Sequence, residues 1–71
     1  MTTDAIVELL GYASGNDLTV RLVLRDGAEV VGIPSSVDTH LTAYEVFLHP
    51  TGDDDTEIGI SLGAIVSAEL A

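Results

Sequence analysis

The residues whose types and spacing could best support chemistry are four acidic residues in the second half of the chain: Asp53, Asp54, Asp55 and Glu57. Hard cations such as calcium bind clusters of carboxylate oxygens, so a calcium site is one interpretation. The spacing does not fit an EF-hand loop, because neither its glycine nor its final glutamate is in place. We therefore predict no metal site. We interpret the run as a solvated hairpin tip, which is also the first place to look for contact with a partner.

The chain has two histidines, His40 and His49. One is expected on a loop and the other at a strand end, so together they would supply half a metal site. Nothing near them repeats at the spacing of metal ligands. His49 precedes Pro50, which is typical of the end of a strand. We interpret both histidines as surface or hydrogen-bonded residues.

Nucleophilic and cofactor chemistry have no support in the sequence. A nucleophilic serine needs an adjacent, oriented base, and no G-x-S-x-G elbow surrounds Ser35, Ser36 or Ser61. The seven glycines are scattered, with no phosphate-binding cluster before a helix. We predict that the protein is not an enzyme and has no cofactor.

Arg21 and Arg25 are the only strong cations, and the chain contains no lysine. Four residues apart on a strand, they share a side and could form a paired anion site. Ion pairs with Glu29 and Glu45 on neighbouring strands are the interpretation we favour.

The charge balance is strongly acidic, with twelve aspartates and glutamates and a formal net charge of −10. Phosphate-backbone recognition depends on lysine and arginine, so direct nucleic-acid binding by a monomer is not expected. A ring of subunits would bring several copies of the two arginines together, so nucleic-acid binding by an oligomer remains an alternative. An acidic surface suits a basic protein partner, and it equally suits simple solubility or a high-salt cytoplasm.

The element pattern is that of a small, mainly β domain. In residues 18–32, LTVRLVLRDGAEVVG, alternating apolar residues precede Asp26-Gly27, which predicts a hairpin with a two-residue turn. We predict strands over residues 18–25, 28–33, 42–49, 56–61 and 65–70, the second ended by Pro34. If residues 35–41 instead extend the second strand, an open sheet replaces the barrel.

An amphipathic helix is predicted over residues 3–13, because Ile6, Leu9, Leu10 and Ala13 share one face. Thr3 or Asp4 is expected to cap its start, and Gly15 its end. The start of the chain does not resemble a signal peptide, and no apolar run approaches the ~18 residues of a membrane span. We therefore expect one cytoplasmic domain over residues 1–71. With so small a core and no cysteine, we also expect a homo-oligomer.

Two segments resemble the motifs of the Sm-like family of small, five-stranded, SH3-like barrels with an N-terminal helix. VRLVLRDGAEVVGIPSSVD resembles the first Sm motif, with Gly27, Gly32 and Asp38 at its marked positions. ISLGAIVSAEL resembles the second. The resemblance implies a ring assembled through the fourth and fifth strands. The apolar final hairpin agrees with such an oligomer edge, which would involve Ile58, Ile60, Ile65 and Val66.

The RNA-contact residues of the family are missing. The family usually has an asparagine shortly after the motif aspartate, whereas this chain has Thr39-His40-Leu41-Thr42. The Lys-His pair of the bacterial RNA chaperones is replaced by Leu62-Gly63-Ala64. In its acidity the chain is similar to the small Sm-like inhibitors of the transcription terminator Rho, which cover a basic RNA-binding surface. The sequence thus predicts a non-enzymatic acidic module that regulates or assembles with a basic protein. The alternative is an Sm-like ring that binds short RNA.

Overall fold

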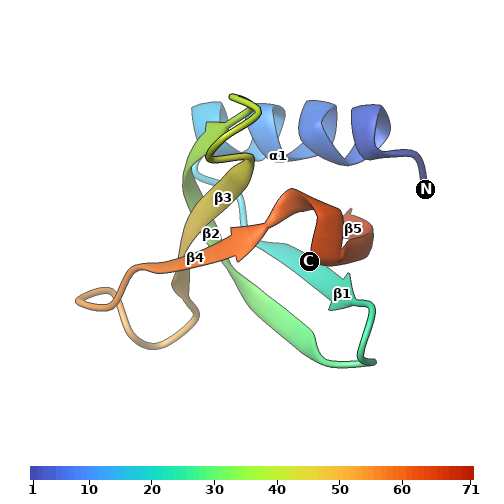
Figure 1. Cartoon of the computed structure of the whole chain (residues 1–71). Coiled ribbons are helices and arrows are strands. Elements are labelled where there is room, and N and C mark those ends of the chain that lie inside the picture. Colours follow the sequence, from blue (N-terminus) through green and yellow to red (C-terminus); the bar gives the residue numbers. More distant parts are fainter.

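The computed structural model describes residues 1–71 as one helix followed by five strands (Figure 1). In chain order the elements are α1 (Thr3–Asn16), β1 (Val20–Leu24), β2 (Glu29–Asp38), β3 (Glu45–Pro50), β4 (Ile58–Ser61), the 3-10 helix η1 (Leu62–Ala64) and β5 (Ile65–Leu70). The predicted mainly β class with a single N-terminal helix is confirmed.

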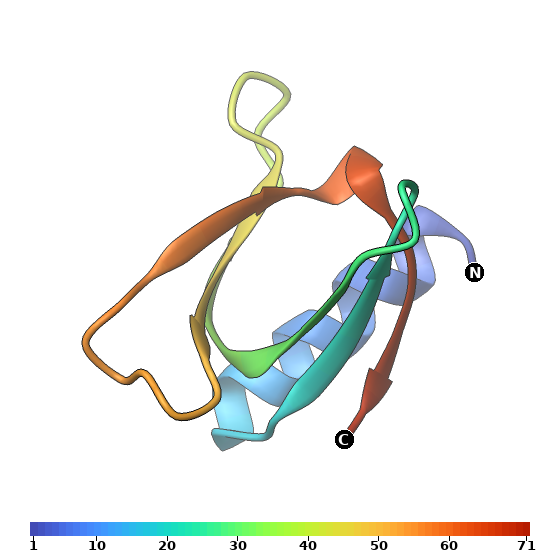
Figure 2. The same cartoon turned by 90° about the horizontal axis from the view of Figure 1, so that it is seen from below.

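The five strands form one antiparallel sheet in the order β4-β3-β2-β1-β5. The sheet is strongly curved, and η1 connects its two edge strands where the curve brings them round (Figure 2). No strand pairing joins β4 to β5, so the hydrogen-bonded sheet is open. Closure into the expected barrel is therefore not observed.

The first hairpin forms as predicted, but its turn is longer. The amide of Gly27 donates to the carbonyl of Leu24, and the amide of Leu24 donates to the carbonyl of Ala28. The loop thus has three residues, of which Gly27 alone has a positive φ, at 88°. The prediction of a two-residue Asp26-Gly27 turn was wrong, because Asp26 instead uses its carboxylate to accept the amide of Ala28.

Strand β2 does not end at Pro34, which corrects the prediction that it stops there. The strand continues to Asp38, and its register against β3 shifts between Pro34 and Ser36. A proline is tolerated at such an irregularity, because the missing N–H is not needed for the ladder. Of the segment 35–41, which the alternative prediction added to the second strand, residues 35–38 belong to β2, and the sheet is not closed.

Helix α1 starts at Thr3 as predicted, but it ends at Asn16, three residues beyond the predicted end. The side chain of Thr2, rather than that of Thr3 or Asp4, caps the helix by accepting the amide of Ala5. The helix continues past Gly15, and Asp17 takes the left-handed C-cap conformation with φ 54°. Aspartate tolerates that conformation better than most residues, which explains why glycine is not required there.

The core lies between α1 and the concave side of the sheet. Ten apolar residues form it: Ile6, Leu10, Ala13, Val20, Leu22, Val46, Leu48, Leu62, Ile65 and Ala68. Three come from α1, which lies across one end of the curved sheet (Figure 1). A short helix is marginal alone in water, so this packing is what stabilises it.

The remaining boundaries differ little from the prediction. Strand β5 spans the predicted residues, while β3 and β4 begin later than predicted, at Glu45 and Ile58. Strand β3 begins later because the residues before it form a turn, in which the amides of Ala43 and Tyr44 both donate to the carbonyl of His40. Helix α1 has 14 residues, which is too short for a transmembrane helix.

Candidate interaction surfaces

The acidic loop, residues 51–57, connects β3 to β4 and projects away from the sheet (Figure 1). Every residue in it is exposed. Asp53 organises the loop, since its carboxylate accepts the Thr56 hydroxyl at 2.7 Å and its carbonyl accepts the Thr56 amide at 3.3 Å. The neighbouring Asp54 and Asp55 are exposed, and their negative charges are available to a partner.

Glu57 lies at the base of the acidic loop and is held by two residues of the sheet. The hydroxyl of Ser35 donates to its carboxylate at 3.0 Å, and Nε2 of His49 lies 3.6 Å from the same oxygen. Nδ1 of His49 is 2.9 Å from the carbonyl of Thr56. Glu57 therefore anchors the loop, while Asp54 and Asp55 point its charge outward. No group of three or more side chains is placed to hold a metal ion.

The contacts of Ser35, Glu57 and His49 were not anticipated, because they depend on the extension of β2 beyond Pro34. The arrangement lacks the geometry of a nucleophilic site. An activated serine donates to an imidazole, whereas Ser35 donates to a carboxylate and to the carbonyl of Phe47. Neither surface groove of the molecule is lined by these three residues. The cluster is best explained as a structural clamp on the acidic loop.

His40 lies on the loop between β2 and β3, at the opposite end of β3 from His49. Its Nδ1 is 2.7 Å from Oδ1 of Asp38, and its amide donates to the same oxygen at 3.0 Å. The amide hydrogen bond, followed by the imidazole hydrogen bond, lowers the pKa of Asp38 below its ordinary value. The two histidines thus have separate carboxylate neighbours, Asp38 and Glu57.

Both arginines are engaged within the chain. Arg21 donates to Glu69 of β5 and lies 4.0 Å from Glu29 of β2. The hydrogen bond to Glu69 is the main reason that the pKa of Arg21 is raised. Nε of Arg25 donates to the carbonyl of Gly63 at 2.7 Å. The predicted ion pair with Glu29 is present, but neither arginine pairs with Glu45.

The four residues predicted at an oligomer edge occupy different environments. Ile58 and Ile60 are half-buried on β4, and Val66 is exposed on β5. Ile65 is 4% exposed and belongs to the core, so its side chain does not line a surface. Both strands are nevertheless sheet edges, as an interface between subunits would require.

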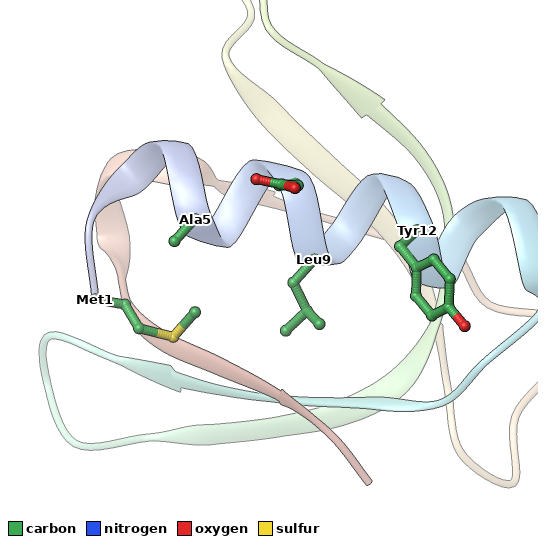
Figure 3. A pocket seen from close by; sticks show the side chains of 5 residues that line it. Met1, Ala5, Leu9 and Tyr12 are labelled. Carbon is green, nitrogen blue, oxygen red and sulfur yellow. The ribbon is translucent and has the colours of Figure 1, made fainter.

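One flank of α1 carries an apolar groove, which we call the α1 groove. It is lined by Met1, Ala5, Glu8, Leu9 and Tyr12 and encloses about 390 Å³. Figure 3 shows the side chains of Met1, Ala5, Leu9 and Tyr12 along this flank. Met1 also reaches β5, because its sulfur lies 3.4 Å from the amide nitrogen of Ala68. This surface was not predicted from the sequence, because Met1 and Tyr12 lie outside the apolar spacing of the helix and Leu9 was assigned only to the core, against which it also packs.

A second groove of about 310 Å³ lies along the end of β2 and is lined by Ser36, Val37, Asp38, Thr39, His40 and Phe47. Its walls combine one aromatic ring with a carboxylate and an imidazole. No lysine or arginine lines it, so it offers a phosphate group no strong cation.

Comparison of the chain with protein-family models, curated proteins and solved structures finds no match.

Proposed function

We propose that this protein is a non-enzymatic binding module that docks on a basic surface of a cytoplasmic protein. The supporting observation is the combination of a net charge of −10 with two arginines that are both engaged within the chain. Ten of the twelve carboxylates are exposed: Asp4, Glu8, Asp17, Asp26, Glu29, Asp53, Asp54, Asp55, Glu57 and Glu69. Such a surface raises the rate of encounter with a positively charged partner.

The acidic loop is the proposed centre of this interaction. It projects from the sheet, and Glu57, Ser35 and His49 hold its base in place. Because its base is fixed, the loop loses less conformational freedom on binding than a mobile tail would. Asp54 and Asp55 make no ion pair within the chain. A lysine or arginine of the partner can therefore pair with them without breaking an existing ion pair.

A charge-matched pull-down tests the proposal. The double variant Asp54→Asn, Asp55→Asn and the control variant Asp17→Asn, Asp26→Asn each change the net charge by two, from −10 to −8. We expect the native chain and the control to retain the same basic proteins at about 50 mM salt and to release them at about 500 mM. The loop variant should retain much less. Equal retention by the two variants would refute the role of the loop, and absence of any salt-sensitive complex would refute the proposed function.

A second candidate function is an Sm-like ring that binds short RNA. It is favoured by the strand order, which leaves β4 and β5 as free edges joined by η1. The motif positions also have structural roles, since Gly27 has a positive φ in the turn and Asp38 accepts the amide of His40. The lack of a cation in the groove beside Asp38 weighs against this function.

Size-exclusion chromatography with light scattering distinguishes the two candidates. A hexamer or heptamer that retains labelled RNA in filter binding at low salt would favour the ring. A stable monomer, with no retained RNA, would favour the acidic protein-binding module.

A further inference from the structure

We propose that the edge of β5, together with the α1 groove, binds an extended segment of a partner protein in which apolar residues alternate with lysine or arginine. The segment would add a sixth strand beside β5. This inference rests on the proposed function, because it assumes a basic partner, and it adds to the acidic loop a second contact site and the chemistry of the segment bound there.

The backbone amides of β5 point alternately toward β1 and toward the free edge of the sheet. The amide of Ala71 donates to the carbonyl of Thr19, toward β1. Successive amides of a strand point to opposite edges, so the amides of Leu70 and Ala68 point away from β1. The contact of the Ala68 amide with Met1 agrees with this direction. The C-terminal half of β5 therefore presents a hydrogen-bonding edge.

The contact that covers this edge at Ala68 is weak. The acceptor of the Ala68 amide is the sulfur of Met1, and a thioether is a weak acceptor. Met1 is 61% exposed and precedes the helix, so it can move aside without unfolding α1. A carbonyl of an added strand would be a stronger acceptor for the same amide.

Exposed apolar side chains lie on the two elements that border this edge, α1 and β5. Tyr12 on the α1 groove is 58% exposed, and Leu70 on β5 is 47% exposed. An added strand would direct alternate side chains toward the helix and cover part of this surface. The bulge between β1 and β5 at residues 65–67 limits regular pairing to the end of the strand. The bound segment is thus expected to be short.

The charge of the groove indicates which kind of segment would bind there. Glu8 lines the groove, and Asp4 lies one turn before it on the same flank of α1, so a row of carboxylates borders the apolar surface. No lysine or arginine lines the groove. A second copy of this chain, itself at −10, or an anionic membrane would be repelled by this row. In a segment that alternates apolar residues with lysine or arginine, the apolar side chains would pack in the groove and the cations would pair with the carboxylates beside it.

The test uses the full chain and two synthetic peptides of eight residues. One alternates lysine with valine or leucine, and the other alternates lysine with serine. We expect the apolar peptide to bind more tightly and to slow hydrogen exchange at the amides of Ala68 and Leu70 by tenfold or more. Tyr12→Ala and Leu70→Ala should each weaken its binding by about tenfold. Leu41→Ala removes a side chain that is 98% exposed on another loop, so it should leave binding unchanged.

Four results would overturn the inference. Equal binding of the two peptides, or chemical-shift changes confined to residues 51–57, would show that charge alone attracts the peptide, and would leave the proposed function intact. Equal binding by the Tyr12, Leu70 and Leu41 variants would exclude the groove. Protection of Ala68 and Leu70 in the free chain, together with a mass above that of the monomer, would show that a second copy covers the edge.

Discussion

Gly32 of β2 lies so close to β3 that a Cβ at this position would be 2.3 Å from the backbone carbonyl oxygen of His49. The obstructing atom belongs to a paired strand, so it cannot rotate away as a side chain would. Gly32 pairs with Pro50 of β3, and the strand to which Gly32 belongs is strongly curved (Figure 2). The absence of a side chain at Gly32 is therefore what allows β2 and β3 to approach this closely.

The first prediction is that Gly32→Ala lowers the free energy of unfolding by at least about 2 kcal/mol, toward the upper end of overpacking effects. Gly11→Ala is the matched control, because no atom lies within 4 Å of its added Cβ and the residue is helical. That control should stabilise the protein by about 0.5–1 kcal/mol. Urea unfolding measures both changes. A Gly32→Ala variant as stable as the native chain would show that the two strands can separate without cost.

Local patterns predicted much of this fold, and long-range contacts account for most of what they missed. The alternation of residues 18–24 and the Asp-Gly pair predicted the first hairpin, because both signals depend on near neighbours. The pairing of Arg21 with Glu69 was not predicted, since it requires β1 to lie beside β5, 48 residues later in the chain. The contact of Met1 with Ala68 likewise joins residues 67 positions apart.

Proline gave the most misleading local signal. Pro34 lacks an N–H and was therefore expected to end its strand, yet β2 accommodates it with a shift in register. That extension brings Ser35 to Glu57 and so determines how the acidic loop is held. The acidic run itself was visible in the sequence, but its anchoring depends on this tertiary contact.

The second prediction concerns Tyr44, which has a positive φ of 35° while its half-buried ring packs against the core. A non-glycine residue in such a conformation stores about 1–3 kcal/mol of strain. Once the ring is removed, glycine should be the better replacement. We predict that Tyr44→Gly is more stable than Tyr44→Ala by about 1 kcal/mol, the reverse of the usual order within a strand.

Phe47 provides the comparison for Tyr44, because it is also half-buried and aromatic but lies within β3 without a positive φ. Phe47→Gly should be less stable than Phe47→Ala in the same denaturant titration. If the two positions showed the same order, strain at Tyr44 would not explain the result.

The third prediction concerns acid stability. The hydrogen bonds from His40 lower the pKa of Asp38 in the folded chain. The ionised Asp38 carboxylate therefore stabilises the fold fully at a pH above the pKa of aspartate in the unfolded chain, about 3.9. This stabilisation is lost as the pH falls through the lower pKa of Asp38 in the folded chain. Asp38→Asn should accordingly reduce stability at pH 6 more than at pH 2.5. Thermal unfolding of both chains across this range measures the difference, and carbon NMR of the Asp38 carboxyl follows the titration directly. A constant difference would exclude a titrating contribution.

The fourth prediction follows from the net charge. Repulsion among the exposed carboxylates opposes folding and is screened by salt, since the Debye length falls to about 3 Å at 1 M. We predict that raising sodium chloride from about 20 mM to 500 mM stabilises the chain by about 1 kcal/mol, or roughly 4–8 °C in Tm. Asp54→Asn, Asp55→Asn should respond less, because its net charge is −8 rather than −10. Sucrose serves as a control for general stabilisation and should not distinguish the two chains. A chain that folded only in molar salt would identify the acidity as an adaptation to solvent, and would remove the charge argument for a basic partner.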